Sequence, residues 1–389
     1  MSKELYEEMM KLVIELCGCV VNGKVPDGKK LQGVDLETLY AVSGKHLLAA
    51  IVAEALERAG IRNEAFIQAK AKAIRKNILF DAERGRILER MEQNGIWYMP
   101  LKGAILKELY PGMGLRQMAD NDILFDAEKA EIVKAFMEDL GYETISFGHS
   151  NHDIYHKDPV LNFEMHTALY GPNHQEEFYL YYRNVKKRLV KDPGNACGYH
   201  FRPEDFYVYM IAHEYKHYMG GGTGVRSLLD IYVYLNHYKD KLDTAYTGRE
   251  LEKLGLVEFE QTGRQLAEKL FGKEAMTSGN AYEVSLSETE KEMYDYILSS
   301  GTYGTSKNSI VNRMRRELGK NVEVTKKRRW RYIWARVFPP REKLLPYYPA
   351  AKYKVLLPFV YVFRIVRGVT SRRKRVFTEW KVVRDQKEL

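Results

Sequence analysis

All the strands that the sequence predicts fall within residues 96–170 of this 389-residue chain. The stretch opens with IWYMPL, a short apolar run without a helical period, and then reaches DNDILF and the alternating segments YETISF, HDIYH and LNFEMHTAL. Two helical patterns separate the first strands, namely KGAILKELYPG and residues 127–140. The order strand, helix, strand, helix and then several strands predicts one compact α/β unit.

The chain on either side of this unit has helical periodicity. Apolar residues recur three and four apart before residue 96, and the pattern resumes at Pro203. A segment rich in Gly, Ser, Thr and Asn, SSGTYGTSKNS, then leads to a basic ending. The fold class expected is therefore α+β, a small mixed sheet with helical regions on both sides. We expect an N-terminal helical region at 1–95, the α/β core at 96–170, a helical domain at 171–300, and a linker with a basic, aromatic-rich tail at 301–389.

Two carboxylates, Asp120 and Asp122, stand at the start of the DNDILF strand. Residues two apart on a strand share a face, so the two charges repel unless a cation or water offsets them. Glu164 lies in the middle of another predicted strand, where an unpaired buried acid is costly. Three such acids suit hard cations such as Mg²⁺. Alternatively, Asp-x-Asp is a solvated strand edge and Glu164 pairs with a lysine.

The wider pattern LKGAILKELYP…GLRQMADNDILF resembles the nucleotidyltransferase superfamily that includes DNA polymerase beta. More narrowly, it resembles an uncharacterised bacterial nucleotidyltransferase family with a Lys-Gly helix start, an Arg, an Asp-x-Asp strand and a Glu-x-His strand. The matching positions here are Lys102-Gly103, Arg116, Asp120-Asn121-Asp122 and Glu164-Met165-His166, with a looser match at His213, His217, Gly224-Val225-Arg226 and Asp230. Asn121 stands where the family usually has an apolar residue.

The resemblance implies a nucleotidyltransferase core and a two-metal transfer of a nucleoside monophosphate to an acceptor hydroxyl. Under this hypothesis Asp120, Asp122 and Glu164 are catalytic metal ligands for Mg²⁺, with Mn²⁺ as an alternative ion. The substrate is a nucleoside triphosphate, ATP among the candidates, and the sequence specifies neither base nor acceptor. The implied nucleotide-binding residues are Lys102, Gly103 and Arg116, and the accessory residues are His166, His213 and Arg226.

These assignments have simpler alternatives. Lys102 and Arg116 can be surface charges beside a turn, and His166 can be a cross-strand hydrogen bonder. The whole chain can be a non-catalytic nucleotide-binding protein that keeps the fold.

A rival motif, HEYKH at residues 213–217, matches H-E-x-x-H. Histidines at i and i+4 share a helix face and can bind Zn²⁺, with Glu214 as general base, which would make the protein a zinc metallopeptidase. Lys216 places an ammonium group near such a metal, and no convincing third ligand follows. Histidines that are packed or hydrogen-bonded between structural elements remain the alternative.

Charge is concentrated at the C-terminal end. Residues 326–389 contain 19 Lys or Arg and 4 Asp or Glu, a net charge of +15, whereas the remainder carries −6. Basic residues interleaved with Trp and Tyr suit RNA or an anionic membrane surface, and the tail could instead lie against the acidic body. We expect no transmembrane segment, because no apolar run approaches the roughly 18 residues that a span needs. Three cysteines and no secretory signal predict a cytoplasmic protein, peripheral at the membrane if the tail binds lipid.

Overall fold

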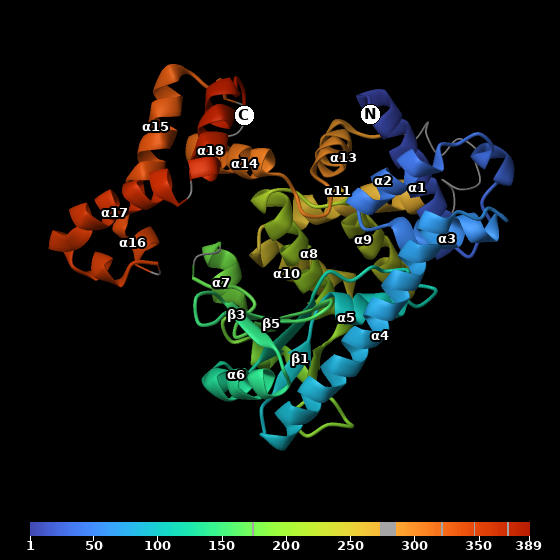
Figure 1. Cartoon of the computed structure of the whole chain (residues 1–389), viewed down its shortest axis with the longest axis horizontal. Helices are drawn as coiled ribbons and strands as arrows, with labels where there is room; N and C mark the ends of the chain where they lie inside the picture. The colour runs from blue at the N-terminus through green and yellow to red at the C-terminus, as the bar shows by residue number, and fades with distance from the viewer. Residues whose placement is uncertain (173–174, 273–284, 320–321, 346, 372) are drawn as a thin grey trace. The chain divides into compact units, whose positions relative to one another are not determined.

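The computed structural model describes all residues except 173–174, 273–284, 320–321, 346 and 372 (Figure 1). The chain forms two compact units. The first comprises Met1–Tyr215 with Gly224–Thr302, and the second comprises Lys216–Thr223 with Tyr303–Leu389. The fold is mixed α+β, as the sequence predicts.

Four helices precede the sheet, namely α1 (Lys3–Val21), α2 (Leu36–Lys45), α3 (Ala49–Arg58) and α4 (Glu64–Gln93). The long helix α4 begins at Asn63, whose side chain accepts a hydrogen bond from the Phe66 N–H. It ends before Gly95, which has a φ of +63° and redirects the chain into the sheet. Residues 1–95 are thus helical, as expected.

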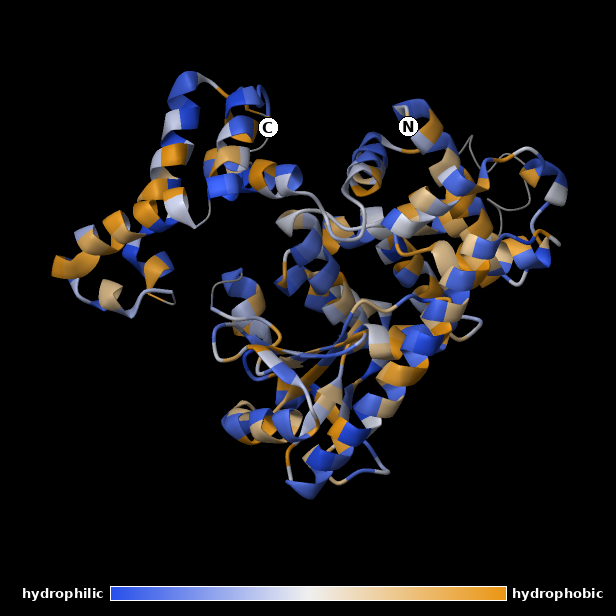
Figure 2. Cartoon of the chain, in the orientation of Figure 1, coloured by the Kyte–Doolittle hydropathy of each residue, from blue (hydrophilic) through white to orange (hydrophobic). Residues whose placement is uncertain are grey.

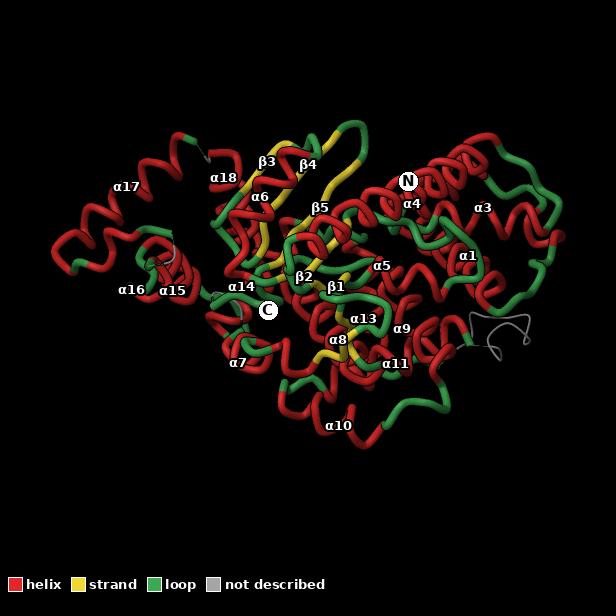
Figure 3. The backbone as a smooth tube through the Cα atoms, turned by 90° about the horizontal axis from the view of Figure 1, so that it is seen from below, coloured by secondary structure: helices red, strands yellow, loops and turns green. Residues whose placement is uncertain are grey.

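The central sheet has the strand order β1-β2-β5-β4-β3 (Figures 1 and 3). Its strands are β1 (Tyr98–Pro100), β2 (Asn121–Phe125), β3 (Glu143–Ser146), β4 (His152–Lys157) and β5 (Leu161–His166). β2 and β5 are parallel, and the other neighbours are antiparallel. The short helix α5 (Gly103–Leu106) joins β1 to the loop before β2, and α6 (Ala130–Asp139) joins β2 to β3.

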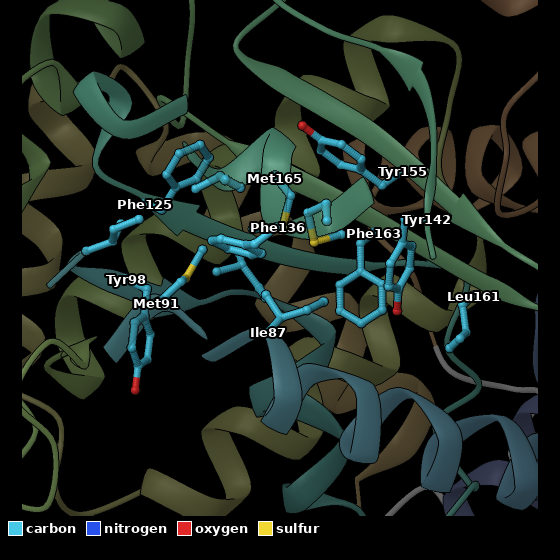
Figure 4. Packing of buried hydrophobic residues seen from close by; sticks show 14 of the residues in the cluster. Ile87, Met91, Tyr98, Phe125, Phe136, Tyr142, Tyr155, Leu161, Phe163 and Met165 are labelled. Carbon is cyan, nitrogen blue, oxygen red and sulfur yellow. The ribbon is translucent and has the colours of Figure 1, made fainter. Parts of the chain in front are cut away.

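One face of the sheet carries the hydrophobic core (Figure 4). Ile123 and Phe125 of β2 and Phe163 and Met165 of β5 point to this face, where they pack with residues of α4 and α6. Because side chains alternate along a strand, Asp122, Glu164 and His166 point to the other face. The sequence alternation in LNFEMHTAL predicts this division correctly.

The remaining elements of the first unit are mostly helical. They are α7 (Glu176–Tyr182), α8 (Pro203–Gly220), α9 (Val225–Tyr238), α10 (Thr244–Lys253), α11 (Val257–Phe271) and α13 (Glu288–Ser300). α8 continues into the second unit beyond Tyr215. Two short antiparallel strands, β6 (Leu189–Lys191) and β7 (Tyr199–Phe201), lie within residues 171–300, where the sequence predicts a helical domain. Strands of three residues are too short to show an alternating pattern.

The second unit is a set of helices rather than an extended tail. It contains α14 (Ser306–Leu318), α15 (Lys326–Val337), α16 (Arg341–Leu344), α17 (Leu357–Thr370) and α18 (Arg373–Asp385). Two small clusters hold it together, one centred on Met314 and Tyr332 and one on Leu344 and Val360. Much of α17 is strongly hydrophobic (Figure 2). Even so, none of the helices among the described residues has both the length and the apolar content to cross a bilayer.

Candidate active site

Asp122 and Glu164 are direct neighbours across the parallel strands β2 and β5. Their side chains therefore share the face of the sheet opposite the hydrophobic core. Asp120 directly precedes β2 and is close enough to both acids for their charges to affect its pKa. The structure thus brings together the three carboxylates that the sequence singles out, from two strands that are distant in the chain.

Asp122 is buried and has two basic neighbours. Its Oδ1 lies 2.8 Å from Nε2 of His166 and 3.2 Å from Nζ of Lys102. The same His166 nitrogen lies 3.6 Å from Oε2 of Glu164, so His166 bridges the two carboxylates. His166 is therefore a cross-strand hydrogen bonder that lies between two of the predicted metal ligands.

The surroundings push the pKa values of the two aspartates apart. Burial and the Asp122 charge raise the pKa of Asp120 to about 6. Burial would also raise the pKa of Asp122, but Lys102 and His166 hold it well below its usual range. At Glu164 burial is again opposed, here mainly by His166, and the pKa is lowered. At neutral pH all three groups are thus mainly carboxylates in a partly buried site.

Lys102 occupies an unusual backbone position at the end of β1. Its φ is +44°, a region that residues other than glycine rarely adopt and that costs on the order of 1–3 kcal/mol. Burial alone would lower the pKa of its ammonium group, but the three facing carboxylates raise it. The strained backbone at Lys102 therefore places an ammonium group beside the three carboxylates, which keep it protonated.

Three cationic side chains fix the loop that leads to Asp120. The Arg116 guanidinium makes a bidentate pair with Asp230 of α9, with both N–O distances 2.8 Å. Arg226 of α9 donates to the Gln117 carbonyl at 2.8 Å, and Lys76 of α4 donates to the Ala119 carbonyl at 2.9 Å. Asp120 and Asp122 therefore directly follow a loop that is anchored to the two helices α4 and α9.

Arg116 and Gly103 differ from their expected roles. The predicted phosphate ligand Arg116 is buried and already bound by Asp230, which also accepts a hydrogen bond from Tyr110. A Cβ at Gly103 would lie 2.7 Å from Nη1 of Arg116 and 2.7 Å from Cε of Met118, so any larger residue there would displace these two side chains. Helix α5 is a single four-residue turn, too short for a substantial dipole directed at phosphates.

Comparison with known protein families gives one match. Residues 32–272 match the sequence model of a family described as uncharacterised nucleotidyltransferase. The match covers the sheet, the three carboxylates and the helices that anchor the loop before Asp120. The chain belongs to this nucleotidyltransferase family. Comparisons with curated proteins and with solved structures give no match.

The carboxylates suit the divalent ion that nucleotidyltransferases of this superfamily are expected to use. Asp120 keeps a raised pKa although Lys102 and Arg226 both act to lower it. Burial and the charges of Asp122 and Glu164 together outweigh these two cations. Oxygen donors in such a cluster fit Mg²⁺ or Mn²⁺.

The HEYKH motif does not form a comparable group. His213 and His217 lie on α8, with Nδ1 of His213 3.9 Å from Oε1 of Glu214. Among the described residues, the groups of three side chains that could hold a metal do not include either histidine. Of the accessory residues predicted with this region, Arg226 lies close enough to Asp120 to affect its pKa, and the His213 ring lies 6.1 Å from that of Tyr209.

Sequence reasoning missed three residues around the site. His152 of β4 lies opposite His166, with Nε2 3.7 Å from Oε2 of Glu164. Lys76 belongs to the charged helix α4 and is affected by the charge of Asp120. Tyr209 of α8 is buried, and together with burial the charges of Asp122 and Glu164 raise the pKa of its phenol. Only His152 had a sequence signal, since it occupies an alternating segment next to the Glu-x-His strand.

Proposed function

We propose that this member of the nucleotidyltransferase family transfers a nucleoside monophosphate from a nucleoside triphosphate to an acceptor hydroxyl. The acceptor oxygen forms a bond to the α-phosphorus, the bond from that phosphorus to the bridging oxygen breaks, and pyrophosphate leaves with its electron pair. The observation that carries the proposal is the convergence of Asp120, Asp122 and Glu164 on one face of β2 and β5.

Each side chain has a role that its surroundings support. Asp120, Asp122 and Glu164 would hold Mg²⁺ or Mn²⁺, which supplies Lewis-acid stabilisation of phosphoryl oxygens when bound. Glu164 is mainly ionised at neutral pH, so it can also accept a proton from the acceptor hydroxyl. Lys102 lies beside the acids with its charge maintained, and it can neutralise part of the triphosphate.

Arg116 is assigned a positioning role instead of a phosphate contact. Its bidentate pair with Asp230 fixes the loop immediately before the aspartates. Gly103 acts in the same way, because it leaves room for the Arg116 guanidinium. Arg226 holds the next residue of this loop and adds positive charge near Asp120.

The decisive experiment uses Asp120→Ala with Asp126→Ala as a matched control. Asp126 lies at the opposite end of β2 and caps the following turn instead of joining the carboxylate cluster. Thermal shifts with each of the four ribonucleoside triphosphates, with and without Mg²⁺, first identify the nucleotide. Transfer of label from its α-phosphate to candidate acceptors is then measured for the three proteins.

We expect Asp120→Ala to lower transfer on the order of 1,000-fold with an unchanged circular dichroism spectrum, and Asp126→Ala to retain activity. Transfer that survives Asp120→Ala contradicts the assignment. Mg²⁺-dependent nucleotide binding without product in any acceptor screen supports the non-catalytic alternative.

A further inference from the structure

Two histidines and one glutamate converge on the site face of the sheet, and they form a different ligand set from the three carboxylates. His152 and His166 are directly opposite each other on the antiparallel strands β4 and β5. Their ring centroids are 5.0 Å apart, and both Nε2 atoms approach Oε2 of Glu164, at 3.7 and 3.6 Å. The three ligand atoms all lie within 4.8 Å of one another.

The separations of 3.6 and 3.7 Å from Oε2 of Glu164 are close to those of two ligands around a single ion. Two ligand atoms that each lie about 2.1 Å from a tetrahedral metal ion are roughly 3.4 Å apart. Adjacent strands hold the three side chains on one face, so little backbone movement is needed to bring them to such an ion. Nε2 of the buried His166 also lies 2.8 Å from Oδ1 of Asp122, so the group directly adjoins the aspartates.

The chemistry of the donors selects the kind of ion. Mg²⁺ takes oxygen ligands almost exclusively, whereas imidazole nitrogen suits Zn²⁺, Co²⁺ and their neighbours. Two imidazoles and one carboxylate make up a common zinc ligand set with room for a further ligand. Binding would require the proton of each ring to reside on Nδ1, which leaves Nε2 as the donor atom.

The geometry points to His152, Glu164 and His166 as a site for a borderline divalent ion of the Zn²⁺ class. The inference deepens the proposed function, because it names the ion held at Glu164. Asp120 and Asp122 then remain the oxygen ligands for Mg²⁺ with the triphosphate. Binding at the histidine site needs neither nucleotide nor acceptor, so it can be measured alone.

The test uses Co²⁺ and Zn²⁺ as separate probes on the full-length chain. Co²⁺ is followed by its visible absorption, and Zn²⁺ by metal analysis after dialysis. His152→Ala is compared with His156→Ala, an exposed histidine on the same strand and face but outside the group. His217→Ala reports separately on the rival HEYKH motif.

We expect one ion per chain in the wild type and in His156→Ala. His152→Ala should bind Co²⁺ at least 100-fold more weakly, since loss of even an outer-shell partner costs about 10–100-fold. Equal Co²⁺ binding by His152→Ala and wild type overturns the inference, and so does loss of the ion only in His217→Ala. If Mg²⁺-dependent transfer is unchanged in a chain that does not bind this ion, the inference fails and the proposed function is retained. If the chain binds the ion but shows no transfer, the proposed function fails and the inference is retained.

An independent observation concerns helix α17 of the second unit. Phe359, Val362, Phe363, Val366 and Val369 are all exposed, Phe359 by 70%, and their spacing places them on one helix face. The opposite face packs through Val360 and Leu357 against the cluster around Leu344. The helix is therefore anchored on one side and presents an apolar stripe on the other.

The same helix and the helix that follows it also expose basic side chains. The exposed ones on α17 and α18 are Arg367, Arg373, Lys374, Arg375, Lys381 and Arg384. Glu379 of α18 already pairs with Arg313 and Arg336, so it offsets little of this charge. Two aromatic side chains of α18, Phe377 and Trp380, are exposed as well.

From this combination we infer that α17 and α18 lie on an anionic membrane surface. An apolar face flanked by Lys and Arg suits insertion at the level of the lipid headgroups. The 14-residue α17 is too short to span a bilayer of about 30 Å. RNA needs the positive charge and stacking aromatics, but it gives no role to a stripe of valines.

The test is co-sedimentation with phosphatidylcholine vesicles that contain or lack phosphatidylserine. We expect binding only with phosphatidylserine, and at least a tenfold loss in Phe359→Ser/Phe363→Ser. Tyr303→Ser removes an equally exposed aromatic of the second unit away from α17, and it should bind normally. Failure to sediment with phosphatidylserine, or tight binding only to single-stranded RNA, overturns the inference.

Discussion

The two faces of the central sheet differ sharply although the same strands supply both. On the core face, Phe163 of β5 is fully buried and packs edge-on against Phe80 of α4 and Tyr142. On the other face the next residue, Glu164, is partly exposed and lies among charged and imidazole groups. Adjacent residues of one strand therefore have different roles. Phe163 stabilises the fold, and Glu164 belongs to the candidate active site.

This separation means that variants on the two faces should have different phenotypes. A change on the core face should lower the free energy of unfolding and affect activity only through the loss of folded protein. A change on the site face should remove nucleotide or metal binding with little change in stability. The following variants test how complete the separation is.

The largest stability effect is expected for Phe163→Ala. Removing a buried aromatic side chain that contacts two other rings should lower the free energy of unfolding by about 3–5 kcal/mol. Its neighbour Glu164→Gln should change that free energy by less than about 1 kcal/mol. Urea unfolding of both variants measures the contrast, and equal losses would show that the two faces are not separate.

A slightly smaller loss is expected when the anchor of the aspartate loop is broken. Asp230→Asn leaves the buried Arg116 guanidinium without its carboxylate, at a cost of about 3 kcal/mol. The double variant Arg116→Met/Asp230→Leu removes both charges and should recover part of this loss. If urea unfolding shows the double variant to be no better than the single one, the cost lies in packing and not in the unpaired charge.

Asp120→Asn should have an effect that depends on pH. The pKa of Asp120 is about 6 in the folded chain, above its ordinary value of 3.8. The folded state therefore binds this proton more tightly, so the contribution of Asp120 to stability is fully present below pH 4 and is lost as the pH rises through 6. In the absence of divalent ions, Asp120→Asn should be more stable than wild type above pH 6, by about 3 kcal/mol.

The same comparison supplies its own controls. The difference between Asp120→Asn and wild type should disappear below pH 4, where Asp120 is protonated in both states. Excess Mg²⁺ at pH 8 should reverse the order, since the ion stabilises only the chain with the carboxylate. If thermal melts show a stability difference between the two proteins that does not depend on pH, the pKa of Asp120 is not raised in the folded state.

The smallest effect is expected at Asn121, the one polar side chain of β2 that points toward the core. It is fully buried, and its amide has no hydrogen-bond partner among the described residues. Asn121→Leu should therefore raise the free energy of unfolding by about 1 kcal/mol. A loss of stability on urea unfolding would indicate that the amide has a partner, such as buried water.

The sequence predicts the strands and their faces because alternation is a local property. It also predicts that Asp120, Asp122 and Glu164 gather, although only the family resemblance connects the two segments. It does not predict that Asp230, 114 residues after Arg116, takes up that guanidinium. Nor does it predict that β5 lies between β2 and β4, the strand order that brings His152 to Glu164. Such contacts depend on tertiary packing between distant segments. The hydrophobic periodicity of a sequence gives information only about local structure.

The parallel pairing of β2 with β5 has a consequence for the order of folding. The segment that contains α6, β3 and β4 connects β2 to β5, since parallel neighbours require a long crossover. Repulsion between Asp122 and Glu164 therefore arises only when β5 pairs with β2. An ion that binds this cluster should act on that pairing, and a nascent chain that ends before residue 161 cannot yet respond to it.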